Sequence, residues 1–162
     1  MSTIMLGIGD YGASSTPGDI VKTLALGSCV GIILLDPRYK MVGMVHVALP
    51  DSSINQKKRD EKPGYFADSA LPALLARMKQ LGSDGNIKEM YVKLAGGAHV
   101  LDASSTFDVG KRNILAVKKA LWQYGTGATA EDVGGQISRT IAVFVDAGHT
   151  ELSSPGRENW SI

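Results

Sequence analysis

The sequence predicts an α+β domain built mainly from antiparallel strands. Two helical patterns and seven or eight short extended stretches are mixed along the 162 residues, without the regular strand–helix alternation of a doubly wound fold. No internal repeat, linker or change of composition divides the chain. We therefore expect a single domain spanning residues 1–162, with a loosely held tail over residues 153–162.

Two segments show helical periodicity. From Tyr65 to Leu81, apolar residues recur at helical spacing and Gly82 follows, while Pro72 inside the pattern predicts a kink or a late start. The pattern returns from Val109 to Tyr124 and ends at Gly125. The extended stretches, rich in β-branched or alternating apolar residues, are 4–8, 19–26, 30–35, 41–49, 88–95, 130–133 and 139–145.

The segment from Leu24 to Pro50 contains the only cysteine, Cys29, and one of three histidines, His46. Two apolar extended runs flank a turn there, which is the pattern of a strand–turn–strand unit. If the loop comprises residues 36–39, Cys29 lies directly opposite His46, with Cβ atoms roughly 4.5–5.5 Å apart. A loop over 36–40 would place the two side chains on opposite faces. The prediction therefore depends on the hairpin register.

Composition argues against several functional classes. Seventeen Lys and Arg against sixteen Asp and Glu leave a net charge of +1, which gives no support for binding nucleic acid or an anionic membrane through bulk charge. No apolar run approaches the roughly 18 residues of a membrane span, so we expect no membrane insertion. A single cysteine and the absence of a signal-peptide pattern at the N-terminus lead us to expect a cytoplasmic location.

Gly7 to Gly12 matches the dinucleotide fingerprint GxGxxG, but we expect no nucleotide cofactor there. A working fingerprint opens a helix whose N-terminus holds the pyrophosphate. Here the turn-forming run from Ala13 to Gly18 follows instead. The three histidines are scattered and no second cysteine exists, so we expect no metal site.

The residues around Cys29 suit nucleophilic catalysis. The thiolate is the attacking species, yet a free thiol with a pKa of about 8.5 is only slightly ionised at neutral pH. The imidazole of His46 can accept the thiol proton and later deliver it to a leaving nitrogen. Gly27 and Ser28 leave room for a substrate and offer backbone N–H groups to an oxyanion. Thr23 provides a hydroxyl to orient His46 or bind the substrate amide.

Each of these residues also has a structural interpretation. A lone cysteine beside an apolar strand is often a small buried hydrophobe, and a histidine between valines is often a core residue with satisfied hydrogen bonds. Thr23 taken alone is an ordinary strand residue. His99 and His149 compete for the role of base, although each follows a break containing glycine or alanine and is expected on a loop.

Five motifs occur in order along the chain. They are Thr23-Leu-Ala-Leu-Gly-Ser-Cys29-Val with Asp36-Pro37 and His46-Val-Ala-Leu-Pro50, then Tyr65-Phe-Ala-Asp68, Gly96-Gly97-Ala98, Gly110-Lys-Arg112-Asn113 and Asp132-Val-Gly134-Gly135. Together they make the chain from about Ile4 to Thr150 resemble CheD, the family of bacterial chemoreceptor glutamine deamidases. The family's catalytic cysteine, histidine and threonine fall on Cys29, His46 and Thr23.

The resemblance implies a sandwich of mainly antiparallel sheets with helices packed outside, similar to the cytotoxic necrotizing factor-type cysteine deamidases. It implies that Cys29 attacks selected receptor glutamine side chains, that His46 protonates the departing ammonia, and that water hydrolyses the thioester to leave glutamate. The same residues would also hydrolyse glutamyl methyl esters. No cofactor is implied. The implied substrates are the cytoplasmic coiled coils of methyl-accepting chemotaxis receptors, and the implied regulatory partner is the phosphatase CheC.

Two departures from the family pattern leave the three catalytic positions untouched. His99-Val-Leu-Asp102 replaces a larger apolar pair, and Ser138 replaces a glycine before Arg139. The first departure alters the wall of the site or the partner surface, so receptor preference is not predicted.

One alternative from another functional class stays open. In it the chain is a non-catalytic adaptor that binds the receptor or CheC, and Cys29 is only a packing residue. The catalytic hypothesis predicts that Cys29→Ala abolishes ammonia release but keeps receptor binding. The adaptor hypothesis predicts that Cys29→Ser leaves signalling intact.

Overall fold

The computed structural model describes residues 1–99 and 108–162, so most of the departure at residues 99–102 lies outside the described residues. The described chain forms ten strands and three α-helices, with short 3₁₀ turns between them. The strands are β1 (Thr3–Leu6), β2 (Tyr11–Ser14), β3 (Ile20–Leu26), β4 (Val30–Asp36), β5 (Met41–Val47), β6 (Tyr91–Gly96), β7 (Ala130–Val133), β8 (Arg139–Phe144), β9 (Thr150–Ser153) and β10 (Trp160–Ser161). The helices are α1 (Gln56–Glu61), α2 (Ala67–Gln80) and α3 (Val109–Gln123).

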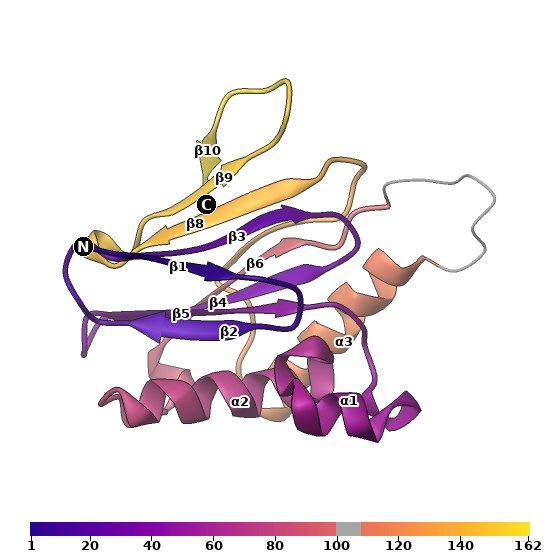
Figure 1. The fold of residues 1–162 in the computed structure, drawn as a ribbon, viewed down its shortest axis with the longest axis horizontal. Helices are drawn as coiled ribbons and strands as arrows, with labels where there is room; N and C mark the ends of the chain where they lie inside the picture. The colour runs from indigo at the N-terminus through magenta and orange to yellow at the C-terminus, as the bar shows by residue number, and fades with distance from the viewer. Residues whose placement is uncertain (100–107) are drawn as a thin grey trace.

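The elements stack in three layers (Figure 1). One sheet has the strand order β1-β3-β8-β9-β10 and the other has the order β2-β5-β4-β6-β7. The helices cover the outer face of the second sheet, opposite the first sheet. Six of the eight strand pairings are antiparallel, and only β1–β3 and β6–β7 are parallel. The predicted α+β class is confirmed.

Strand β4 holds the layers together. All seven of its residues are buried, because each face of the strand meets a different core. Ile32 and Leu34 pack among the residues of α2 and α3, whereas Ile33 and Leu35 pack between the two sheets. A strand covered on both faces needs apolar residues at every position, which explains the unbroken apolar run in the sequence.

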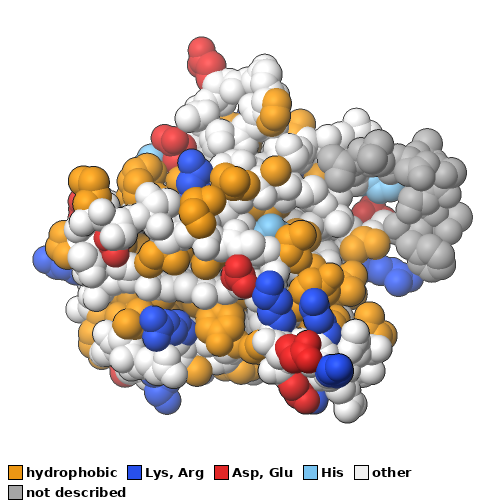
Figure 2. Space-filling view, in the orientation of Figure 1, with side chains coloured by type: hydrophobic (Ala, Val, Ile, Leu, Met, Phe, Trp, Pro, Cys, Tyr) orange, Lys and Arg blue, Asp and Glu red, His pale blue; other side chains and the backbone are white. Residues whose placement is uncertain are grey.

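The two long helices occupy the segments that the sequence predicts. Helix α2 begins at Ala67 and continues through Pro72, so the alternative of a late start is wrong. Helix α3 begins after Asp108, whose carboxylate accepts a hydrogen bond from the Lys111 amide at 3.0 Å. Charged side chains of both signs gather over α1, at the lower right of Figure 2. None of the helices in the described ranges has the length and apolar character needed to cross a membrane.

The glycine motif near the N-terminus does not open a helix. Gly12 lies within strand β2, which pairs with β5, so the geometry that holds a pyrophosphate is missing at this motif, as the sequence predicts. Strand β2 itself was not expected, because Tyr11–Ser14 is short and contains a glycine.

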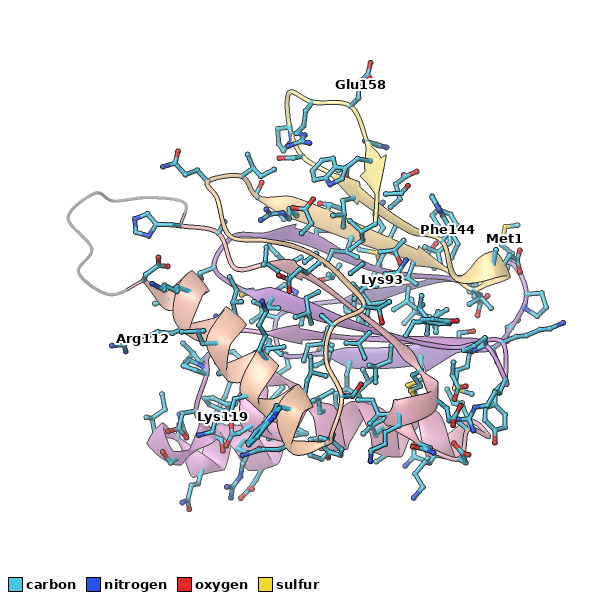
Figure 3. All side chains as sticks on the ribbon, turned by 180° about the vertical axis from the view of Figure 1, so that it is seen from behind. Met1, Lys93, Arg112, Lys119, Phe144 and Glu158 are labelled. Carbon is cyan, nitrogen blue, oxygen red and sulfur yellow. The ribbon has the colours of Figure 1, made fainter. Side chains whose placement is uncertain are left out.

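The C-terminal tail is held at several points, contrary to the expectation that it is loose. Trp160 and Ser161 pair with β9, and the Trp160 indole donates to Asp132 at 2.6 Å. Lys93 on β6, labelled in Figure 3, donates to the terminal carbonyl of Ile162. Small polar residues and a proline suggested flexibility, but contacts of the last three residues with the sheets outweigh that local preference.

Candidate active site

His46 lies on strand β5 of the β4–β5 hairpin, and Cys29 directly precedes strand β4. Gly31 pairs with His46 across the hairpin, and Cys29 lies two residues before Gly31. The prediction that Cys29 stands directly opposite His46 is therefore wrong by two residues. The turn comprises residues 37–40 rather than 36–39, because Lys40 adopts a left-handed conformation with φ of 49°. A shift of two residues keeps the side chains on the same face.

Several contacts place this face between the two sheets. A Cβ atom added at Gly31 would lie 2.5 Å from the Ile141 side chain of the other sheet. Cys29 packs against the cluster of buried residues between the sheets. Diagonal neighbours on an antiparallel pair lie roughly 7–8 Å apart, within reach of a large side chain such as imidazole. Glycine at position 31 thus leaves space next to both Cys29 and His46.

Thr23 binds the imidazole from the facing sheet. Its Oγ1 lies 2.6 Å from Nδ1 of His46 and 2.9 Å from the carbonyl oxygen of Leu6. A carbonyl oxygen only accepts hydrogen bonds, so the single hydroxyl hydrogen of Thr23 goes to Leu6. Nδ1 of His46 must then donate its hydrogen to Thr23. This leaves Nε2 unprotonated, with a lone pair ready to accept a proton.

His46 is only 3% exposed, and its Nε2 has no hydrogen-bond partner within the described part of the chain. Burial lowers the pKa of His46 from 6.5 to about 4, although the negative charge of Asp10 partly opposes this shift. Asp10 in turn pairs with Lys62 at 3.2 Å. At neutral pH the imidazole is therefore an uncharged base with a free acceptor nitrogen.

Cys29 is half-buried, and burial raises the pKa of its thiol. The free protein thus holds a neutral thiol and a neutral imidazole on the same face of the hairpin, rather than a preformed ion pair. No helix begins at Cys29, because strand β4 follows it.

The loop that carries Cys29 is held by its carbonyl groups. The carbonyls of Gly27, Ser28 and Cys29 accept hydrogen bonds from the Ala98 amide at 2.8 Å, the Asn113 side chain at 2.9 Å and the Gly97 amide at 2.7 Å, respectively. Three bound carbonyls fix the orientation of the intervening peptide groups. Gly27 and Ser28 thus lie in the same loop as Cys29, which joins β3 to β4.

The other two histidines lie elsewhere. His99 and His149 are both exposed or half-exposed, lie outside the strands and helices, and have Asp108 and Glu151 as nearest acidic partners at 3.7 and 3.9 Å. Neither contacts Thr23. Of the three histidines, His46 alone is buried.

The sequence alone gives no role to two residues that support the loop: Asn113 appears there only within a motif, and Arg139 only as the residue after Ser138. Asn113 binds Ser28 across 85 residues of chain, and Arg139 donates to the carbonyl of Gly96 at 3.3 Å. Arg139 is itself buried and pairs with Asp132 at 2.9 Å. Local sequence patterns carry no signal for contacts at such separations, so only the fold identifies their partners.

Comparisons with known proteins identify the family of the chain. Residues 48–154 match the family model described as CheD chemotactic sensory transduction. A protein of Syntrophotalea carbinolica named probable chemoreceptor glutamine deamidase CheD is 52% identical over all 162 residues of both chains. The chemoreceptor glutamine deamidase CheD of Thermotoga maritima is 39% identical over 144 residues, which cover 89% of this chain and 87% of the relative. The chain therefore belongs to the CheD family.

Proposed function

We propose that this chain is a chemoreceptor glutamine deamidase that converts selected receptor glutamines to glutamate, with Cys29 as nucleophile. One observation supports this most directly: the buried His46 is fixed by Thr23 through Nδ1, while Nε2 lacks a partner among the described residues. A histidine that served only the core would be expected to have both nitrogens satisfied. The names of the two relatives, which cover 100% and 89% of this chain, support the same activity.

In the first step, Sγ of Cys29 attacks the carbon of the glutamine carboxamide while Nε2 of His46 takes the thiol proton. The tetrahedral oxyanion lies toward the backbone N–H groups of the loop at Gly27 and Ser28. Nε2 then returns the proton to the departing nitrogen, and ammonia leaves. The product of this half-reaction is a thioester between Cys29 and the glutamyl side chain.

In the second step, water replaces ammonia in the site. Nε2 of His46 takes a proton from the water, which attacks the thioester carbon, and then returns that proton to the sulfur of Cys29. The receptor gains a glutamate and the thiol is regenerated. A glutamyl methyl ester would follow the same route with methanol as the leaving group.

The surroundings of the site suit a helical substrate that remains folded. Ile8 and Leu24 are each more than half exposed although they are apolar, and they flank Leu6 and Thr23 along the chain. The ion pair of Asp10 and Lys62 lies near His46, whose backbone N–H donates to the Asp10 carbonyl at 3.0 Å. We propose that the coiled coil of a receptor's cytoplasmic domain docks here.

We further propose that the chain works in the cytoplasm and that CheC regulates it. We also propose that its fold is related to that of the cytotoxic necrotizing factor-type deamidases.

A receptor cytoplasmic fragment tests the activity directly. Ammonia release and residue-level mass spectrometry are measured with the wild-type protein and with Cys29→Ala. The proposal predicts conversion of specific glutamines by the wild type and none by Cys29→Ala, with equal receptor binding by both. Binding without conversion by the wild type would contradict it and favour the adaptor function.

A further inference from the structure

Asn113 connects the two segments that carry the nucleophile and the base. Its Nδ2 group donates one hydrogen bond to the carbonyl of Ser28 at 2.9 Å and a second to the carbonyl of Ala48 at 3.0 Å. Ser28 directly precedes Cys29, and Ala48 follows His46 by two residues. A single planar amide group therefore fixes the separation of these two stretches of backbone.

The start of α3 is shaped to bring Asn113 to this place. A Cβ atom added at Gly110 would lie 2.5 Å from the carbonyl oxygens of both Gly97 and Ala98, so only glycine lets the helix approach this segment. Gly97 and Ala98 are the residues whose amides bind the loop carbonyls of Cys29 and Gly27. Asn113 follows Gly110 by about one helical turn and is completely buried.

Asparagine at this position carries two costs in stability. Asparagine is a poor helix former, because its side chain competes for backbone hydrogen bonds. Its Oδ1 is buried and has no partner in the described ranges 1–99 and 108–162, which costs free energy. An apolar residue would avoid this cost but would leave the carbonyls of Ser28 and Ala48 without these donors. What asparagine supplies is a pair of N–H donors aimed at two different carbonyls.

We propose that Asn113 is a positioning residue for deamidation, which sets the distance and angle between Cys29 and His46 without touching the substrate. This inference rests on the proposed roles of Cys29 and His46. Misplacement of reacting groups by about 1 Å can cost on the order of 100-fold in rate. Loss of the two hydrogen bonds should therefore lower kcat much more than it raises KM.

The test compares Asn113→Ala and Asn113→Asp with Val117→Thr. Neither Asn113 variant has the two N–H donors, and Asn113→Asp keeps the shape of the side chain. Val117 is equally buried one turn further along α3, so Val117→Thr reports the effect of perturbing this helix alone. For the folded fraction of each variant, kcat and KM are measured with a receptor fragment, and the rate of Cys29 alkylation by iodoacetamide is measured across pH.

We expect kcat to fall by about 10- to 100-fold in both Asn113 variants, with KM within about twofold of wild type. The pH profile of Cys29 alkylation should shift toward that of His46→Gln, because the thiol loses its base. Val117→Thr should leave kcat and the alkylation profile unchanged. Wild-type values in the Asn113 variants would overturn the inference. If the wild type released no ammonia, the proposed function would fail instead, and an unchanged alkylation profile in the Asn113 variants would still contradict the positioning role.

Discussion

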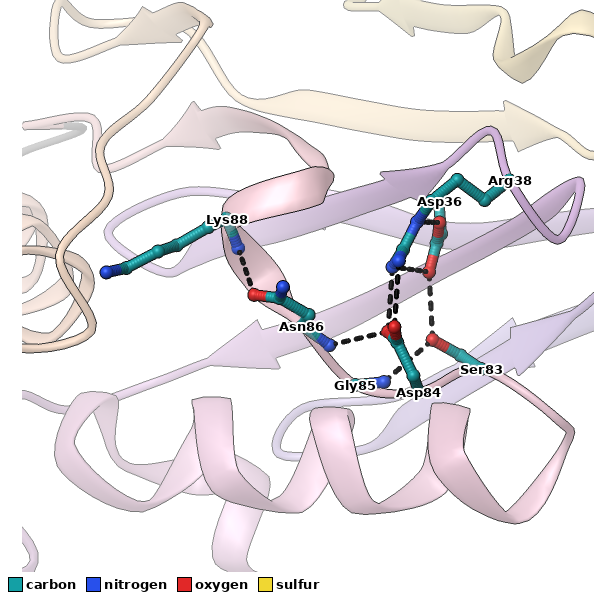
Figure 4. A network of polar contacts seen from close by, with 7 residues as sticks. All are labelled: Asp36, Arg38, Ser83, Asp84, Gly85, Asn86 and Lys88. Carbon is teal, nitrogen blue, oxygen red and sulfur yellow. Dashed lines mark hydrogen bonds and ion pairs between the residues drawn. The ribbon is translucent and has the colours of Figure 1, made fainter.

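The two ends of the β4–β5 hairpin each bury an ionisable side chain, but they treat it differently. At the turn, Asp36 is 1% exposed and both of its carboxylate oxygens have partners. Arg38 and Ser83 bind it, and Arg38 also binds Asp84 (Figure 4). At the open end, His46 is buried to a similar degree, yet Nε2 has no partner among the described residues.

This difference distinguishes Asp36, which has a structural role, from His46, for which we propose a role in the reaction. The network around Asp36 joins the turn to the loop after α2, and Arg38 holds the pKa of Asp84 at about 2. Every carboxylate oxygen of Asp36 and Asp84 accepts at least one hydrogen bond within the protein. His46 instead keeps an Nε2 that is unpartnered within the described ranges, on the hairpin face that Cys29 shares, at a cost in stability that suits a group kept for chemistry.

The largest expected effect comes from removing the base. His46→Gln should reduce deamidation by roughly 10²- to 10⁴-fold, the range for loss of general acid–base catalysis. Its free energy of unfolding should change by only about 1 kcal/mol, because a single hydrogen bond to Thr23 is lost. Receptor-fragment deamidation and urea unfolding measure the two effects. Activity within tenfold of wild type would show that another group acts as base.

A smaller effect is expected from Thr23→Val, which keeps the shape of the side chain and removes its hydroxyl. The imidazole then loses the acceptor that holds the hydrogen on Nδ1, so part of the population carries it on Nε2 and cannot accept the thiol proton. We expect kcat to fall by about 10- to 100-fold, in line with loss of a group that orients a catalytic histidine. Thr23→Ser retains the hydroxyl and serves as the control. Equal activity of the valine and serine variants would contradict this role.

The turn should respond in the opposite way. Asp36→Asn weakens the pairing with Arg38 and should lower the free energy of unfolding by about 1–3 kcal/mol. Deamidation per folded molecule should stay at the wild-type level, because the turn lies at the other end of the hairpin from His46. Chemical denaturation and activity assays on the same preparations check both statements. A loss of specific activity without loss of stability would remove the contrast between the two ends.

Much of the fold could be predicted from the sequence, because the spacing of apolar residues reflects which face of each helix or strand is buried. The helix from Val109, the strand over residues 130–133 and the strand from Arg139 occur where the pattern predicts them. The predicted hairpin register is wrong by two residues. The left-handed conformation of Lys40 could not be predicted, because lysine has no particular preference for it. Strand β2 is too short and too poor in β-branched residues to stand out.

The residues of the candidate site could be selected from the sequence, but the hydrogen bonds that hold them in place could not be predicted. Thr23, Cys29 and His46 lie within 24 residues, so local spacing and family motifs suffice to select them. The direction of the hydrogen bond from His46 to Thr23 depends on the carbonyl of Leu6 in a different strand. The role of Asn113 depends on contacts across 65 and 85 residues.

The central claim is that Thr23 and burial hold His46 as a neutral base with a free Nε2. Nitrogen-15 NMR of the imidazole across pH tests it directly, since the two ring nitrogens have different shifts when protonated and unprotonated. We predict the Nδ1–H form from pH 8 down to about pH 5, with protonation only near the lowered pKa of about 4. The rate of deamidation should therefore not fall through protonation of His46 until the pH approaches 4. An Nε2–H form, or protonation near the ordinary pKa of 6.5, would contradict the account.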